Sequence, residues 1–315
     1  MKIISRRRFL AEMAASAGAT LLSLPAFAQG DDPRLILLGT KGGPSLRGVA
    51  QVPSSNALVI GRDVYVVDAG YGVSYRLVEK KLPLTAIRAI FITHHHSDHN
   101  LELGTLLYNA WANSIPRAIE VYGPEGVEPL VRASMESNKF DIETRMADEG
   151  RPDPRKLSNV RTYRAGPVME NDQVRVTALR NHHPPITESY ALKFEIKGGK
   201  TVVFSGDTAY FPALAEFAKD CDYLVHEVMY GPALERIVQL NPSAKTLMDH
   251  LRASHTLAED VGRIAAQAKA RNLVLTHFVP GGDPVIPDDD WKRAVRTHYD
   301  GNVIVGRDSL EIGLK

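Results

Sequence analysis

The sequence of 315 residues contains a single cysteine, Cys221, so no disulfide bond can form within the chain. It also lacks internal repeats, low-complexity segments and any run of 18 or more apolar residues, which excludes a membrane span of ordinary length. Apolar residues make up 44% of the chain and charged residues 24%, as in a globular protein of one large or two smaller domains. Stability must therefore come from an apolar core and from any bound metal, and Cys221 is expected to be a small core residue.

Residues 1–28 are expected to form an export signal that is removed from the mature protein. They have a basic start, an apolar middle and a small-residue A-x-A end. Arg6 and Arg7 are followed one residue later by Phe-Leu, which resembles the twin-arginine signal. An ordinary secretory signal with extra positive charge is the alternative. The twin-arginine export machinery is thus an expected partner, and residues 29–315 are expected in the periplasm.

The mature chain has no excess of positive charge. Removal of residues 1–28 takes away four basic side chains and one acidic one, which changes the net charge from +1 to −2. A mildly acidic protein without a basic run is a poor candidate for binding nucleic acid. We therefore do not expect nucleic acid as a partner.

Short runs rich in Val and Ile, bounded by Gly, Pro, Asp or Asn, predict about a dozen strands. Helical patterns lie between them, notably over residues 98–113, where Asp98 is placed to cap the helix, and over 256–270. This alternation predicts a layered α/β domain. The polar segment at about 123–158 is helical in pattern and reads as an insertion, either a solvated excursion or a wall over a site.

Four histidines and an aspartate crowd the stretch "FITHHHSDHN". His94 and His96 alternate at the end of a predicted strand, so both should point to one side, and His95 should point to the other. Asp98 and His99 follow where the strand should turn into a helix. Imidazole nitrogen and carboxylate oxygen are the ligands that zinc and similar divalent ions prefer. The stretch therefore predicts a metal site.

Several motifs follow one another in an order that resembles the metallo-β-lactamase fold hydrolases. These are "LLGTKGGP", "VVDAG", "ITHHHSDHN", "SGDT", "HEVMY", "SHTLAED" and "LTHF". The chain is most similar to the branch that holds ribonuclease Z-like and arylsulfatase-like enzymes. The resemblance implies a four-layer αββα sandwich of the α/β class. Residues 29–315 would form this single domain, with the helical insertion at about 123–158.

The resemblance also implies two divalent metal ions, with zinc expected and manganese or iron as alternatives. Seven side chains match the family's ligand positions. One ion would be held by His94, His96 and His183, the other by Asp98, His99 and His277, with Asp207 between the two.

Three of these assignments have competitors or supporting residues. His183 is preferred because it directly precedes Pro-Pro, and His182 is its competitor. Asp207 by itself could be a turn or cap residue, but its "SGDT" context agrees with the other motifs. Asp68 in "VVDAG" is expected to orient a ligand histidine, since the second ring nitrogen of such a histidine needs an acceptor.

Further residues match the pair that assists leaving-group departure in ribonuclease Z. His255 in "SHTLAED" is the expected proton donor, and Glu227 in "HEVMY" would orient it. A buried network that only steadies the metal loops is the alternative, and His226 is expected to play that supporting role. The expected catalytic residues are Asp98, His255 and Glu227.

The implied chemistry is attack by a hydroxide that bridges the two ions, formed because its pKa falls to about 7. Our first expectation is a dinuclear metal-dependent hydrolase of a small phosphodiester or aryl sulfate ester. The alternatives are a carboxylic ester or lactone hydrolase, a ribonuclease Z-like endonuclease, and a non-catalytic periplasmic metal-binding protein. The long arm, rich in Gly and basic residues, with which ribonuclease Z grips tRNA has no convincing equivalent here. Arg145 and Lys245 are candidates to hold an anionic substrate.

Overall fold

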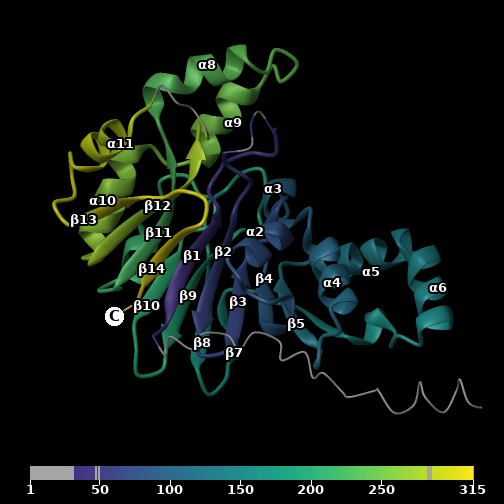
Figure 1. The fold of residues 1–315 in the computed structure, drawn as a ribbon. Coiled ribbons are helices and arrows are strands. Elements are labelled where there is room, and N and C mark those ends of the chain that lie inside the picture. The colour runs from purple at the N-terminus through teal and green to yellow at the C-terminus, as the bar shows by residue number, and fades with distance from the viewer. Residues whose placement is uncertain (1–31, 47, 49, 282–285, 315) are drawn as a thin grey trace, which may run out of the picture. The chain divides into compact units, whose positions relative to one another are not determined.

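The computed structural model describes residues 32–46, 48, 50–281 and 286–314 (Figure 1). The expected export signal, residues 1–28, lies outside the described residues. Within the described ranges, no helix has both the length and the apolar composition needed to cross a membrane.

Two seven-stranded sheets form the centre of the domain. The first has the order β14-β1-β2-β3-β4-β5-β6 and the second β13-β12-β11-β10-β9-β8-β7. The strands of the first sheet are β1 (Arg34–Gly39), β2 (Ser55–Ile60), β3 (Asp63–Val67), β4 (Ile87–Phe91), β5 (Ile119–Gly123), β6 (Ser158–Thr162) and β14 (Leu310–Gly313). The strands of the second are β7 (Gly166–Glu170), β8 (Val174–Arg180), β9 (Tyr190–Ile196), β10 (Thr201–Phe204), β11 (Tyr223–Met229), β12 (Asn272–Val279) and β13 (Asn302–Val305).

The helices flank these sheets or connect their strands. They are α2 (Val73–Glu79), α3 (Ser97–Asn100), α4 (Leu103–Ala112), α5 (Val127–Ser137), α6 (Lys139–Glu149), α7 (Ala213–Phe217), α8 (Leu234–Gln239), α9 (Leu247–Ser254), α10 (Ala258–Ala268) and α11 (Asp288–Val295). In Figure 1, α10 and α11 lie beside the second sheet, and α4 lies beside the first. Two sheets between layers of helices confirm the expected αββα sandwich.

The main core lies between the two sheets. Phe91 of β4 packs edge-on against Phe194 of β9, with 5.1 Å between the ring centroids. Strands covered on both faces, such as β2 and β11, are buried at every residue and therefore read as continuous apolar runs. Strand β8 alternates between buried and exposed residues. Its pattern is that of a strand with one face open to solvent.

A second core joins the outer face of the second sheet to the helices α7, α10 and α11. Helix α10 buries Val261, Ile264, Ala265 and Ala268. These positions recur with the helical period and form one apolar stripe. Cys221 is buried in the same core, as expected, and burial raises the pKa of its thiol to about 12.

The predicted helix over 98–113 is broken into α3 and α4. Asp98 does not cap it, so that expectation is wrong. The Asp98 carboxylate instead accepts a hydrogen bond from the Gly43 backbone N–H at 2.8 Å. The break therefore lets α3 present side chains to a site while α4 packs on the sheet.

The segment at about 123–158 contains α5 and α6. It connects β5 to β6, which are parallel neighbours at one edge of the first sheet. A parallel pair needs such a crossover connection, because a tight turn cannot return the chain to the same end.

Candidate metal centre

Strand ends from both sheets bring the predicted ligands together. His94 and His96 lie in the loop after β4, and α3 continues this segment. In the second sheet, Asp207 follows β10, and His277 lies near the carboxyl end of β12. The carboxyl ends of strands in α/β proteins are where sites usually form, because the connecting loops converge there.

The seven predicted ligands form two groups that share one carboxylate. In each group the candidate ligand atoms all lie within 4.8 Å of one another. The first group is His94, His96, His183 and Asp207, and the second is Asp98, His99, Asp207 and His277. All seven are buried except His96, which is half-buried. His182 is exposed and belongs to neither group.

Asp207 stands at the centre of the arrangement. Its Oδ2 lies 3.1 Å from His277 Nε2, 3.3 Å from His99 Nε2 and 3.8 Å from His94 Nε2. In the first group, His96 Nδ1 lies 3.1 Å from the Nε2 atoms of both His94 and His183. The carboxylate is thus the one element common to both groups.

The backbone at His277 departs from regular pairing. Glu227 pairs with Thr276 and Val228 with Phe278, so His277 is an extra residue between two pairs of the β11–β12 ladder. Its φ is 45°, a left-handed value that is rare for a residue with a side chain. A bulge of this kind re-aims a side chain. Here it accompanies the placement of the His277 ring against Asp207.

Hydrogen bonds fix the orientation of the ligand rings. Asp68 Oδ2 lies 2.8 Å from His99 Nδ1, and Asp68 Oδ1 accepts from the Thr93 backbone N–H, also at 2.8 Å. His183 Nδ1 donates to the backbone carbonyl of Ser254 at 2.8 Å. Because Nδ1 of His99 and Nδ1 of His183 make these hydrogen bonds, Nε2 of each ring faces the other predicted ligands. The Asp68 carboxylate thus makes the hydrogen bond to a predicted ligand histidine that was expected of it.

The electrostatics of the second group favour a positive charge. Burial alone would lower the pKa of His99, but Asp207, Asp68 and Asp98 outweigh it and raise that pKa well above its ordinary value. His99 Nε2 is buried and makes no hydrogen bond to any described residue. A cation among these atoms would supply the charge that the carboxylates favour. A set of imidazoles and carboxylates without thiolate suits zinc, manganese or iron, so the residues fit divalent metal binding.

Glu227 and His255 form a buried pair beside the second group. His255 Nδ1 lies 2.9 Å from Glu227 Oε2, and Glu227 Oε1 accepts from the Thr208 backbone N–H at 2.7 Å. Burial works against the charged imidazole, but Glu227 more than offsets it and raises the pKa of His255 to about 9. The His255 ring stacks on that of His277 at 5.6 Å.

His226 does not join the site. It belongs to none of the candidate ligand groups, and its Nδ1 donates to the backbone carbonyl of Glu227 at 2.6 Å. Burial lowers the pKa of His226 to about 4. A neutral, buried ring of this kind steadies β11, which agrees with the supporting role expected for it.

His250 of α9 was not assigned a role from the sequence, yet it lies over the site. Its ring centroid is 5.6 Å from that of His255 and 6.0 Å from that of His96. Burial, and then the charge of His255, lower the pKa of His250. No motif marks this residue, because its place depends on how α9 packs against loops distant in the sequence.

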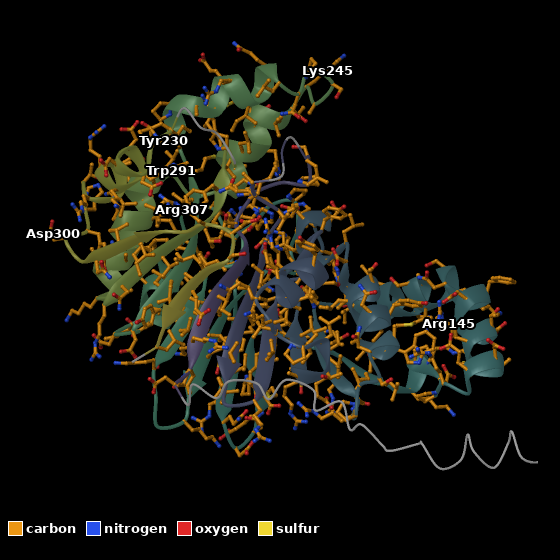
Figure 2. All side chains as sticks on the ribbon, in the orientation of Figure 1. Arg145, Tyr230, Lys245, Trp291, Asp300 and Arg307 are labelled. Atoms are coloured by element: carbon orange, nitrogen blue, oxygen red, sulfur yellow. The ribbon has the colours of Figure 1, made fainter. Side chains whose placement is uncertain are left out.

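A cavity of about 530 Å³ opens beside the metal centre. His250 and His255 line it together with apolar side chains of α8 and α9, and Lys41 and Arg236 are its basic residues. Arg145 and Lys245, the basic residues named as candidates from the sequence, do not line it. Arg145 is bound to Asp141 and Glu149 within α6, and Lys245 is exposed in the loop between α8 and α9 (Figure 2).

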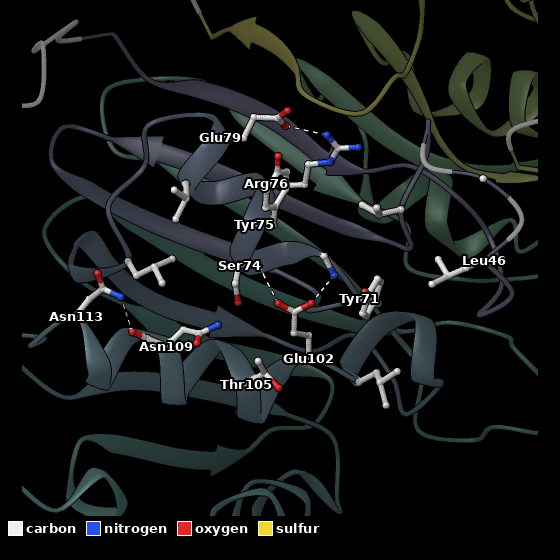
Figure 3. Close-up of a pocket in the computed structure, with 16 residues that line it drawn as sticks. Leu46, Tyr71, Ser74, Tyr75, Arg76, Glu79, Glu102, Thr105, Asn109 and Asn113 are labelled. Carbon is white, nitrogen blue, oxygen red and sulfur yellow. Dashed lines mark hydrogen bonds and ion pairs between the residues drawn. The ribbon is translucent and has the colours of Figure 1, made fainter. Parts of the chain in front are cut away.

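A larger hollow of about 1200 Å³ lies between α2 and α4 (Figure 3). Its lining includes the exposed side chains of Tyr71, Tyr75 and Leu101. Glu102 sits within it and accepts a hydrogen bond from the Ser74 backbone N–H at 3.1 Å. None of the seven predicted ligands is among the residues that line this hollow.

The fold and the clustered donors agree with a comparison to known families. The pattern of the Beta-lactamase superfamily domain matches residues 64–278. The chain belongs to this superfamily. The matched residues run from β3 into β12 and contain all seven predicted ligands. The expected family is therefore confirmed.

Relatives extend this similarity over nearly the whole chain. A ribonuclease Z of Mycobacterium bovis is 28% identical over 277 residues, which cover 87% of this chain and 95% of that protein. A ribonuclease Z of Mycobacterium marinum is 28% identical over 279 residues, with 87% and 96% covered. These relatives confirm the ribonuclease Z branch and a metal-dependent hydrolase, whereas neither is named an arylsulfatase.

Solved structures share the fold. The metallo-beta-lactamase fold protein YhfI from Bacillus subtilis aligns with a TM-score of 0.66 at 20% identity, covering 90% of this chain and 99% of that one. The short form of human tRNase Z aligns with a TM-score of 0.65 at 20% identity, with the same coverage. At this identity the likeness supports the architecture alone.

The adjacent histidines 182 and 183 provide a matched test of the donor set. His183→Ala removes a buried ring whose Nε2 faces the cluster, so the purified protein should hold about one metal ion fewer per chain. His182→Ala alters an exposed ring and should leave the metal content unchanged. Metal per chain is measured by atomic emission after dialysis. Loss of metal from the His182 variant, with none from the His183 variant, would overturn the assignment.

Proposed function

We propose that this protein is a metal-dependent phosphodiesterase that cleaves phosphodiester bonds in RNA, with two divalent ions at its centre. The single observation that carries the proposal is the shared carboxylate of Asp207, which lies in both groups of donors. Relatives named ribonuclease Z, aligned over 95% of their length, support an RNA substrate. This is the ribonuclease Z-like alternative, and it is better supported than our first expectation of a small phosphodiester or sulfate ester.

The expectation against nucleic acid rested on net charge, on the missing arm and on export, which would separate the mature chain from tRNA. Net charge describes the whole mature chain, whereas a substrate meets the local potential of a cleft. Lys41 and Arg236 place basic groups in the cavity beside the donors. A short, single-stranded end of RNA fits this cavity better than a folded tRNA does, because binding such an end requires no separate arm to hold the rest of the RNA.

The bound metal ions and the protein side chains would contribute different parts of the chemistry. Bound divalent ions would polarise a phosphoryl oxygen and make water nucleophilic near neutral pH. Asp98 is held by Gly43 and lies 3.3 Å from His277 Nε2, so its carboxylate is fixed at the second group, where it would accept a hydrogen bond from the attacking water and orient it. With a pKa of about 9, His255 carries a proton at neutral pH. It can donate that proton to the departing oxygen, while Glu227 keeps the ring charged and aimed.

A small phosphodiester is the competing substrate. The cavity of about 530 Å³ favours it, because this volume lies within the usual range for small-ligand pockets. The same chemistry would serve both substrates, so rates with each decide between them.

We also propose that residues 1–28 direct export and that residues 29–315 act as one domain in the periplasm. The basic start, the paired arginines and the A-x-A end support this. Sequencing the N-terminus of the exported protein tests it, with Gln29 as the expected first residue.

A substrate panel tests the proposed function. We expect the protein to cleave a single-stranded oligoribonucleotide and bis(4-nitrophenyl) phosphate, to lose both activities with a chelator and to regain them with zinc or manganese. The measurement compares kcat/KM for these substrates with those for 4-nitrophenyl sulfate and 4-nitrophenyl acetate. Faster turnover of the sulfate or the carboxylic ester than of any phosphodiester would refute the proposal. Tight metal binding without turnover would support the alternative of a non-catalytic metal-binding protein.

The proton-donor role of His255 predicts a leaving-group effect. His255→Ala should slow phosphodiesters with poor, alkoxide leaving groups by about 10²–10⁴-fold, the usual contribution of general acid catalysis. Nitrophenolate needs little protonation, so esters that release it should slow much less. Rates across a series of aryl and alkyl phosphodiesters give the dependence on leaving-group pKa. Equal slowing of all members would show that His255 serves only to support the metal loops.

A further inference from the structure

His250 stands at the boundary between the metal centre and the cavity lined by α8 and α9. Its ring centroid lies 5.6 Å from His255, 6.0 Å from His96 and 6.1 Å from His183. It is half-buried and lines the cavity, but it belongs to none of the candidate ligand groups. These distances place His250 outside the two groups of predicted ligands, with its ring lining the adjacent cavity.

A chain of hydrogen bonds fixes the tautomer of the His250 ring. The Ser254 hydroxyl donates its only proton to the backbone carbonyl of Pro184. Ser254 Oγ also lies 3.3 Å from His250 Nδ1, and with its own proton engaged it can only accept there. His250 Nδ1 therefore carries the ring proton, and Nε2 has a free lone pair.

The spacing of this pair supports the assignment. His250 and Ser254 are four residues apart on α9, so they share one face of the helix. Ser254 is fully buried, and its backbone carbonyl accepts the hydrogen bond from His183 Nδ1. The same residue thus orients one ligand of the metal centre and one ring beside it.

We propose that His250 Nε2 accepts a hydrogen bond from a substrate hydroxyl next to the scissile phosphate, which in RNA is the ribose 2′-hydroxyl. This inference rests on the proposed function and deepens it, because it makes the site selective for ribonucleotides. His250 then determines specificity and binds substrate without holding metal.

The chemistry of the surroundings explains why an acceptor is needed at this point. A phosphodiester offers only acceptor oxygens, which pair with donors such as the Arg236 guanidinium that lines the cavity. A hydroxyl on the substrate must in turn find an acceptor. The lone pair of His250 Nε2 supplies one beside the cavity.

The test compares two substrates that differ in one hydroxyl. One is a short single-stranded oligoribonucleotide, and the other has a 2′-deoxy residue only before the scissile phosphate. At pH 8, above the ordinary pKa of imidazole, His250 is neutral. We expect the wild-type protein to prefer the ribose substrate by about tenfold in kcat/KM, the effect of one hydrogen bond. His250→Leu should reduce that ratio to about one, and His250→Gln should keep part of it because its amide oxygen can accept.

Arg252→Ala is the matched control, because Arg252 is exposed on the same helix and should retain the wild-type ratio. An unchanged ratio in His250→Leu would overturn the inference, and so would equal rates for the two substrates with the wild-type protein. Both results would leave the phosphodiesterase function standing. Failure of the wild-type protein to cleave either substrate, or bis(4-nitrophenyl) phosphate, would instead refute the proposed function and the inference with it.

Discussion

The buried carboxylate of Asp207 is the constraint on which the rest of the centre depends. Its Oδ2 is surrounded by imidazole nitrogens of His277, His99 and His94 at 3.1, 3.3 and 3.8 Å. Placing an ionised carboxylate in the interior is costly unless opposite charge and hydrogen-bond donors surround it. Burial alone would raise the pKa of Asp207, yet His277 and His99 lower it well below its ordinary value. The carboxylate is therefore kept ionised, as a metal ligand must be.

The two sheets must pack correctly before this centre exists. Thr93 and His94 follow the first sheet, whereas Asp207 and His277 belong to the second. The backbone N–H of Tyr190 in β9 donates to the carbonyl of Thr93 at 3.2 Å and so links the two halves next to the ligands. Because the ligands come from distant segments, the free energy of metal binding also stabilises the packed sandwich. In a chain with one cysteine and no disulfide, the bound metal would thus act as the cross-link between the two sheets.

Much of the fold and of the ligand set could be predicted from the sequence, and the reasons are local. His94, His96, Asp98 and His99 lie in one strand-to-helix turn, so their spacing alone indicates a metal site. The distant ligands could be assigned only through motif order. Residues whose role depends on packing were missed or misread. Asp98 is not a helix cap, because Gly43 reaches it from another segment.

His250 carries no motif, and the position of α9 relative to the strand ends cannot be read from its sequence. The substrate could not be predicted from the sequence for a similar reason. Net charge is a property of composition, whereas the proposed RNA cleavage would depend on the local potential of a few groups at one cavity.

The most direct test of the central claim is an anomalous difference map from crystals of the zinc-loaded protein, measured on both sides of the zinc absorption edge. The account predicts two peaks, one within each group of donors, with the Asp207 carboxylate in contact with both. A single peak under saturating zinc, or peaks that do not touch Asp207, would contradict it.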